Sequence, residues 1–299
     1  MIPEEGRRPA REKDTVVLAH SYQDPEIVRA ADAAGDSFAL ARAAERLKAR
    51  RAVVCGVRFM AECVKILSPG TQVILAREAG CPMAEQLTPE QILAEKAKHP
   101  GCAVVCYINT TAAIKAVCDV CVTSSCAERV VRALPQDEIL FLPDPNLGAF
   151  LAGRIPEKRF FFLGEGCPVH TSVGAEEAAR VRAAHPGAPL WVHPECRAEV
   201  CAQAQLVGST KAILEQGLSF SGEEAIIGTE SSIARFLQSE RPDKRFYPLS
   251  EKLVCPDMRK TTREDLERAL AGRGGVEIDL PEPERRAAEG ALRRMMELA

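Results

Sequence analysis

Three cysteine-proline pairs recur along the chain at a nearly constant spacing. They are Cys81-Pro82, Cys167-Pro168 and Cys255-Pro256, and the steps from 81 to 167 and from 167 to 255 are 86 and 88 residues. A period of this length corresponds to a small α/β unit rather than to a short solenoid repeat. Because equivalent ends of three such units can meet, we expect these three thiols, the repeat cysteines, to bind one metal or iron-sulfur cluster.

Three thiolate ligands leave one coordination position of a metal centre without a protein ligand. An open position allows the metal to act as a Lewis acid on a substrate. The alternative is that the three cysteines only pack at the ends of strands, since cysteine is among the most buried residue types. Their common spacing favours ligation.

A second group of cysteines offers a rival metal site. Cys118, Cys121 and Cys126 have a C-x2-C-x4-C spacing that is also typical of metal binding. However, Cys121 lies within an apolar stretch that predicts a strand, and Cys118 ends the preceding helix, so their side chains need not converge. We rank this site second. The other cysteines are expected in or near the core: Cys55, Cys63, Cys102, Cys106, Cys196 and Cys201.

Polar residues keep the spacing of the cysteines. His20, Tyr107 and His193 each follow an apolar run, at steps of 87 and 86 residues from 20 to 107 to 193. Each is followed two residues later by a second polar residue, which can reach the place where the same strand ends: Tyr22, Asn109 and Glu195. Such a set of imidazole, phenol, amide and carboxylate groups is suited to moving protons and binding carboxylate oxygens.

A third repeated feature is a hydroxyl residue 17 positions further along, namely Ser37, Ser124 and Thr210. We expect these residues, with Ser209, to cap helices. A helix N-terminus presents free N-H groups and positive potential to an anion. Three such termini aimed at one centre would hold a phosphate or a dicarboxylate. The chain has no Walker motif and no strand-linked G-x-G-x-x-G, so nucleotide binding has little support.

The elements that must position these residues alternate between strands and helices. Apolar runs predict strands at 16–19, 52–55, 73–76, 103–106, 120–122, 139–142, 160–163, 225–227 and 245–249, with a further strand ending at 192. This alternation is typical of βαβ units with parallel sheets and helices on both faces. In such sheets the ligand lies beyond the carboxyl ends of the strands, where the repeated polar residues fall.

The period predicts three domains with a threefold-like arrangement around a shared centre. We place the first domain at 1–84 together with 257–299, the second at 85–170 and the third at 171–256. The helices expected at Thr262 to Leu270 and Pro283 to Leu298 have no counterpart in the repeats. We expect both to pack on the first unit.

Composition restricts the class of protein. With 46% hydrophobic and 27% charged residues, the chain reads as an ordinary globular protein, and a net charge of -3 gives no basic footprint for nucleic acid. The charged segment Met1 to Asp14 is not a secretory signal, and no stretch is long and apolar enough to span a membrane. We therefore expect a cytoplasmic protein, in which cysteines are metal ligands, catalytic groups or core residues rather than disulfides.

Eight motifs give the chain a specific resemblance to the quinolinate synthase family, the iron-sulfur enzymes of de novo NAD biosynthesis. The motifs cover nearly the whole chain: His20-Ser-Tyr-Gln, Gly80 to Glu85, Tyr107 to Thr110, Val122 to Ser125, Pro143 to Gly148, Cys167 to His170, His193 to Cys196 and Val207 to Lys211. The resemblance implies three αβα domains around a pseudo-threefold axis. It also implies a [4Fe-4S] cluster held by one cysteine from each domain, here Cys81, Cys167 and Cys255.

The resemblance further implies a reaction and its residues. The reaction would condense iminoaspartate (iminosuccinate) with dihydroxyacetone phosphate to quinolinate, phosphate and water, with the open iron as Lewis acid. The implied catalytic residues are Tyr22, Tyr107, His193 and Glu195. The implied substrate-binding residues are His20, Ser37, Tyr107, Ile108, Asn109, Ser124, His193, Pro194, Glu195, Ser209 and Thr210. The enzyme that supplies iminoaspartate is the one protein partner that this reaction suggests.

Two other functions stay open for these cysteines, and the sequence differs from the family pattern at one place. A [4Fe-4S] hydro-lyase acting on another small hydroxy acid would use the same ligands, whereas electron transfer or iron sensing would favour a fourth cysteine ligand, and no fourth cysteine shares the period. Some family members carry a C-x-x-C-x-x-C run around the last cluster cysteine, but Cys255 has no neighbouring cysteine. A thiol switch beside the cluster is therefore unsupported.

Overall fold

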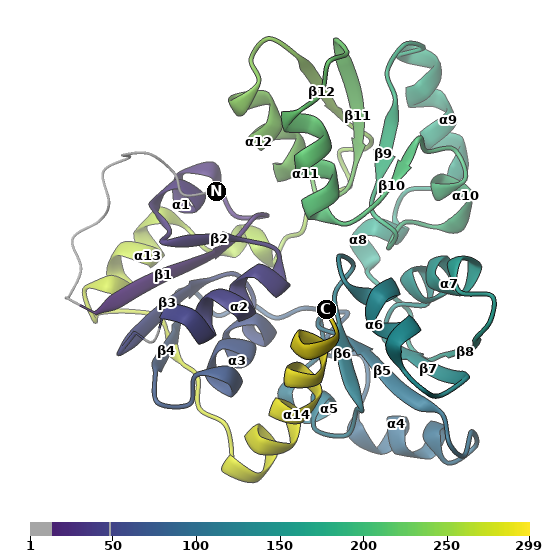
Figure 1. Ribbon diagram of the computed structural model, residues 1–299. Helices are drawn as coiled ribbons and strands as arrows, with labels where there is room; N and C mark the ends of the chain where they lie inside the picture. The colour runs from purple at the N-terminus through teal and green to yellow at the C-terminus, as the bar shows by residue number, and fades with distance from the viewer. Residues whose placement is uncertain (1–13, 48) are drawn as a thin grey trace.

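The chain folds into three α/β units grouped around a common centre. The structure is a computed structural model that describes residues 14–299 except residue 48. In Figure 1 the first unit is purple, the second blue to teal and the third green, and each is a sheet flanked by helices. The predicted α/β class is therefore confirmed. The charged segment Met1 to Asp14 lies outside the described residues except for Asp14.

The three sheets share one strand order, in which the first strand of the unit lies inside the sheet and the second at its edge. The first sheet is ordered β2 (Ala33–Gly35), β1 (Thr15–His20), β3 (Arg51–Cys55) and β4 (Gln72–Leu75). The second is ordered β6 (Val120–Val122), β5 (Ala103–Tyr107), β7 (Glu138–Leu142) and β8 (Arg159–Phe162). The third is ordered β10 (Leu206–Val207), β9 (Leu190–Val192), β11 (Glu224–Gly228) and β12 (Arg245–Pro248).

All these strands pair in parallel, so their carboxyl ends lie at one edge of each sheet. The central strands β3 and β5 are buried along their whole length, which explains why their sequences are apolar except for Arg51 at the start of β3 and Tyr107 at the end of β5. One strand departs from the pattern. The short β13 (Val276–Glu277) pairs antiparallel with β4.

A polar anchor also repeats in the three units. The main-chain N-H near the start of each first strand donates to a side chain 15 residues further along, at 2.7 Å in every case: Val17 to Asp32, Val104 to Asp119 and Leu190 to Gln205. A carboxylate serves in two units and an amide in the third. The units are therefore similar in their local bonding as well as in strand order.

Helices cover both faces of each sheet and produce three layers. In the first unit α2 (Ser37–Leu47) and α3 (Arg58–Leu67) form one layer, and α1 (Pro25–Ala30) with α13 (Arg263–Leu270) forms the other. The second unit has α6 (Ala127–Ala133) with α7 (Pro145–Arg154), and α4 (Pro89–Lys96) with α5 (Ala112–Lys115). The third has α11 (Thr210–Leu218) with α12 (Ser232–Glu240), and α9 (Ala175–Ala184) with α10 (Ala198–Cys201).

The two C-terminal helices have different neighbours. As predicted, α13 packs on the first unit, where it contacts β3 and α1. The prediction was incomplete for α14 (Glu282–Leu298), which contacts α3 of the first unit as predicted but also contacts α5, β6 and α6 of the second (Figure 1). Its buried face, which includes Ala288 and Leu292, fills the seam between the two units. No helix among the described residues is long and apolar enough to cross a membrane.

Candidate functional site

The loops at the carboxyl ends of the strands line one cavity at the centre of the three units. The repeat cysteines all belong to its wall, although each comes from a different unit. Cys81 follows β4, Cys167 follows β8 and begins the turn of α8 (Pro168–Thr171), and Cys255 follows β12 and precedes the 3-10 helix η1 (Met258–Lys260). The structure therefore brings together three thiols that lie 86 and 88 residues apart in sequence.

The spacing of these thiols discriminates between a single ion and a cluster. Among the described residues, the three sulfurs do not fall within 4.8 Å of one another. Thiolates on one tetrahedral zinc ion lie about 2.3 Å from the metal and hence less than about 4 Å apart. A cluster of several irons is larger, and it takes cysteine thiolates as ligands. The three thiols are therefore set too wide for a single ion and are compatible with a larger metal centre such as an iron-sulfur cluster.

Each repeat cysteine begins a tight turn whose main-chain N-H groups lie close enough to its sulfur to lower the pKa of the thiol. The donors lie two or three residues further along: Met83 and Ala84 for Cys81, His170 for Cys167, and Asp257 and Met258 for Cys255. N-H groups that converge on a sulfur stabilise its thiolate form.

Burial nevertheless dominates the ionisation of these thiols. It raises the pKa of Cys81 to about 12 and the pKa of Cys167 to about 11, and it also raises the pKa of Cys255. The free thiols are therefore protonated at neutral pH. A metal that binds them must displace their protons.

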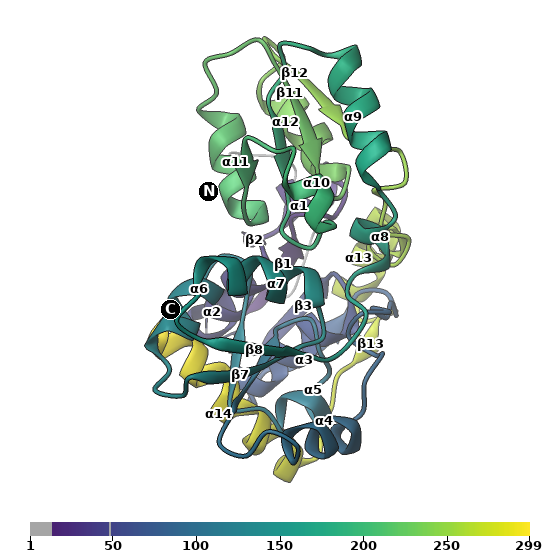
Figure 2. The ribbon, with the colours of Figure 1, turned by 90° about the vertical axis from the view of Figure 1, so that its right-hand side faces the viewer.

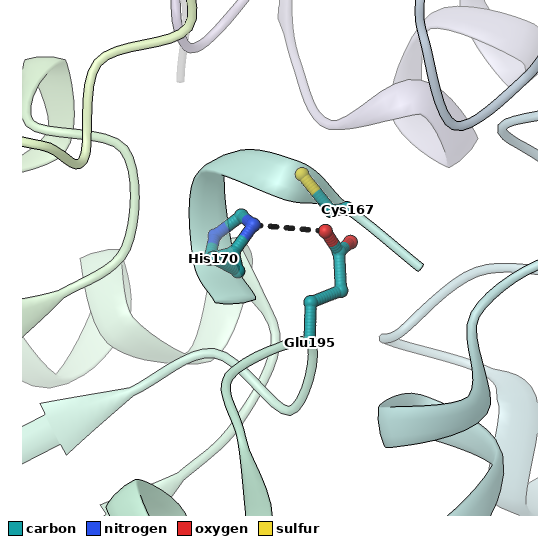
Figure 3. A group of neighbouring side chains, drawn as sticks. All are labelled: Cys167, His170 and Glu195. Atoms are coloured by element: carbon teal, nitrogen blue, oxygen red, sulfur yellow. Dashed lines mark ion pairs between the residues drawn. The ribbon is translucent and has the colours of Figure 1, made fainter. Parts of the chain in front are cut away.

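A chain of three hydrogen bonds and one ion pair links tyrosines from two units across the same cavity. The Tyr107 hydroxyl donates to Glu195 Oε1 at 2.6 Å, and Glu195 Oε2 lies 2.9 Å from His170 Nδ1 (Figure 3). On the other side of the ring, His170 Nε2 lies 3.0 Å from Thr229 Oγ1, which is 3.0 Å from the Tyr22 hydroxyl. These five side chains form one continuous path between the first and second units.

The centre of this path is a buried ion pair. Burial raises the pKa of Glu195, but His170, His193 and the Tyr107 hydroxyl together hold that pKa well below its usual range. Burial lowers the pKa of His170, yet Glu195 and Cys167 raise it well above the value of a free histidine. Both groups are therefore charged. Burial and the Glu195 charge raise the pKa of both tyrosines, Tyr22 and Tyr107, which stay protonated.

The other two histidines of the cavity are neutral. Burial is the main cause that lowers the pKa of His20 to about 3 and the pKa of His193 to about 4. Their Nδ1 atoms accept main-chain N-H groups of Tyr22 at 3.1 Å and Glu195 at 3.4 Å, so the proton of each ring is on Nε2. His193 donates that proton to Ser124 Oγ at 3.0 Å.

The structure places most of the predicted substrate-binding residues on the cavity wall. Those lining it are His20, Ser37, Tyr107, Ile108, Asn109, Ser124, His193, Glu195 and Thr210. Pro194 and Ser209 are not among the lining residues. Ser209 instead accepts the N-H of Ala212 at 3.2 Å, and it caps α11 as predicted.

The predicted caps of the other two helices were wrong. Asp36, rather than Ser37, accepts the N-H of Ala39 at the start of α2, at 2.9 Å. The N-cap of α6 is Cys126, whose side chain makes no capping bond. Because neither Ser37 nor Ser124 is used as a cap, both hydroxyls are available to the cavity.

Several polar residues of the cavity and its surroundings were missed from the sequence. They are His170, Thr229, Asp144, Glu230 and Asp36. Asp144 and Glu230 could have been found, because they lie 86 residues apart and each is the second residue after a strand. His170 could not have been found by its spacing. The equivalent positions, three residues after the other repeat cysteines, are Ala84 and Met258.

The rival cysteine group does not converge. Cys118 Sγ donates to the carbonyl of Ile114 at 3.1 Å, and Cys121 Sγ lies 3.5 Å from Cys106 Sγ. Cys126 Sγ accepts the N-H of Thr123. In the described part of the chain, the one group of three potential metal ligands within 4.8 Å is Cys167, His170 and Glu195, shown in Figure 3. A lone ion at this group would have to break the ion pair between His170 and Glu195.

The sequence as a whole matches a known family. Residues 5–297 match the family model described as NadA, quinolinate synthetase A protein. The chain belongs to the quinolinate synthase family.

A quinolinate synthase from Methanoregula boonei is 44% identical over 299 residues, which cover 100% of this chain and 98% of that protein. One from Caldicellulosiruptor saccharolyticus is 43% identical over 290 residues, covering 97% and 95%. One from Geobacter metallireducens is 43% identical over 296 residues, covering 99% and 97%. Members of this family are enzymes.

The neutral state of His20 predicts how stability depends on pH. A histidine in an unfolded chain has a pKa near 6.5, whereas the pKa of His20 in the folded chain is about 3, so the unfolded chain binds one more proton between these values. Stability from this residue is complete above pH 6.5 and is lost as the pH falls, by about 1.4 kcal/mol per pH unit. The free energy of unfolding, measured between pH 4 and 7, should fall less steeply with decreasing pH for His20→Gln than for the wild type. Equal slopes for both proteins would contradict the assignment.

Proposed function

We propose that the chain is a quinolinate synthase that condenses iminoaspartate with dihydroxyacetone phosphate to give quinolinate, phosphate and water in the biosynthesis of NAD. The family relationship supports this activity. The observation that carries the proposal is that Cys81, Cys167 and Cys255 line the same cavity as the path of hydrogen bonds and one ion pair from Tyr22 to Tyr107. A metal-ligand set and a proton path thus face one enclosed space.

The three repeat cysteines would hold a [4Fe-4S] cluster. Among the described residues, the cavity wall includes no fourth cysteine, which would leave one iron without a protein ligand. When bound, such a cluster supplies a Lewis acid that polarises an oxygen or nitrogen atom of the substrate. Electron transfer, which would favour full cysteine ligation, is therefore the weaker interpretation.

The polar wall of the cavity suits two anionic substrates. His20 Nε2-H and the Asn109 amide are hydrogen-bond donors on that wall, and Ser37 adds a hydroxyl. The helix α2 begins at Ser37, and α11 begins at Thr210, which also lines the cavity. Main-chain N-H groups at such helix ends favour carboxylate and phosphate groups.

The hydrogen-bonded path can deliver a proton to a departing oxygen of the substrate. Tyr22 would give its hydroxyl proton to that oxygen and receive a proton from Thr229, which in turn receives one from His170 Nε2. The distances along this route are 3.0 Å at both steps. Glu195 holds His170 in its charged form, so the proton is available at neutral pH. On the opposite side, Tyr107 orients the Glu195 carboxylate. The neutral His193 orients Ser124.

The proposed reaction is tested by an anaerobic assay with a cluster variant. The reconstituted protein should contain about four irons and four sulfides per chain, and it should form a product with the absorbance of a pyridine dicarboxylate only when both substrates are present. Cys81→Ser should lose the cluster and the activity, whereas Cys118→Ser should keep both, since Cys118 lies outside the cavity wall. Retention of the cluster by Cys81→Ser would contradict the ligand set. Turnover of a hydroxy acid alone would indicate a hydro-lyase.

The role of Tyr22 is tested by removing one hydroxyl. Tyr22→Phe keeps the ring but ends the proton path, and loss of a general acid typically costs a factor of about 100 to 10,000 in rate. We expect kcat to fall in this range while the iron content stays unchanged. Tyr247→Phe is a matched control, because this tyrosine stacks on His185, and neither residue lines the cavity. Wild-type kcat in Tyr22→Phe would refute the proton path.

A further inference from the structure

The main-chain N-H group of each repeat cysteine makes the same kind of hydrogen bond. The N-H group of the cysteine donates to a nearby carboxylate: Cys81 to Glu85 Oε1 at 3.0 Å, Cys167 to Asp144 Oδ2 at 3.2 Å, and Cys255 to Glu230 Oε1 at 3.4 Å. Only the sulfur of a cysteine is needed for metal ligation. Ligation therefore does not explain why the main-chain N-H of all three cysteines is hydrogen-bonded to a carboxylate.

The bond is repeated although the position of its acceptor is not. Asp144 and Glu230 are each the second residue after a strand, β7 and β11, and they lie 86 residues apart. The equivalent position in the first unit, two residues after β3, is Val57, whose side chain cannot accept a hydrogen bond. There the acceptor is Glu85, which approaches from the turn that follows Cys81. Two different routes thus supply the same contact.

The residue before two of the three cysteines is a glycine that leaves room for this contact. A Cβ atom on Gly80 would lie 2.6 Å from Glu85 Oε1, and a Cβ atom on Gly166 would lie 3.1 Å from Asp144 Oδ2. The first distance is too short for any side chain, so glycine lets the carboxylate approach. In the third unit Val254 occupies this position, and the bond from Cys255 to Glu230 is the longest of the three.

Two of the carboxylates are fixed by further bonds. Asp144 Oδ1 accepts the N-H of Leu147 at 2.9 Å and caps α7. Glu230 Oε2 accepts the N-H of Ser232 at 2.8 Å, and its Oε1 accepts from Arg259 at 3.3 Å. Each carboxylate therefore ties the main chain of a cysteine to a rigid part of its unit. Groups that orient metal ligands in this way commonly change metal affinity by about 10-fold to 100-fold.

We propose that Glu85, Asp144 and Glu230 are positioning residues that hold the three cysteine turns in the conformation that binds the cluster. The inference rests on the proposed function for the presence of the cluster. It assigns to each unit a carboxylate that acts through the main chain of its cysteine. What matters in this assignment is the acceptor oxygen rather than the negative charge.

Glu85 gives the sharpest test because it is exposed, so its removal should leave the fold intact. The reconstituted Glu85→Ala protein should have wild-type circular dichroism but release iron to a chelator about 10-fold faster than wild type. Glu85→Gln should restore the wild-type rate, since an amide oxygen also accepts an N-H group. Glu90→Ala, which removes another exposed carboxylate five residues further along, should behave as wild type.

The buried acceptor of the second unit provides an independent pair. Asp144→Ala should release iron faster, because it leaves the Cys167 N-H without its acceptor, while Asp119→Ala, which removes the carboxylate bound to the Val104 N-H, should not affect release. Wild-type release from both alanine variants, Glu85→Ala and Asp144→Ala, would overturn the inference. Equally fast release from Glu85→Ala and Glu85→Gln would also overturn it, because charge would then be decisive. If the wild-type chain binds no cluster, the proposed function itself fails.

Discussion

The structure depends on one buried carboxylate, Glu195. Its side chain is almost inaccessible to solvent, and a charge in such a place costs several kcal/mol unless it is paired and hydrogen-bonded. His170 supplies the opposite charge and Tyr107 supplies a hydroxyl, and Tyr107 belongs to a different unit. The units must therefore stay together for this charge to be satisfied. The same contacts set the charge of His170 and connect it, through Thr229, to Tyr22.

The repeat explains how so many polar groups reach one place. Three sheets with the same strand order direct the carboxyl ends of their strands towards a common centre, and each unit brings one cysteine and one pair of polar residues to it. The chemistry, however, lies in the differences between the units. His170 stands where the other units have Ala84 and Met258, so that only the unit of Cys167 carries an ionisable side chain at this position.

The sequence was sufficient to predict the three units, the meeting of Cys81, Cys167 and Cys255, and the location of the site. A long period with several repeated residues is specific, and parallel sheets fix the edge to which those residues belong. Spacing could not identify His170, because a unique residue has no period. Local sequence preferences gave the wrong caps for α2 and α6. They also missed β2, a stretch rich in alanine and glycine that forms a strand by pairing with β1. An amphipathic pattern showed that α14 has a buried face but did not show which units it covers. The predicted domain boundaries stay predictions.

The measurement that tests this account most directly is the turnover of Glu195→Gln after anaerobic reconstitution. Glutamine has the same shape but no charge, so it can keep a hydrogen bond to Tyr107 while it no longer holds His170 in its charged form. We predict wild-type iron and sulfide content together with a loss of at least about 100-fold in kcat for quinolinate formation. An intact cluster with full turnover in this variant would contradict the central role of the buried charge.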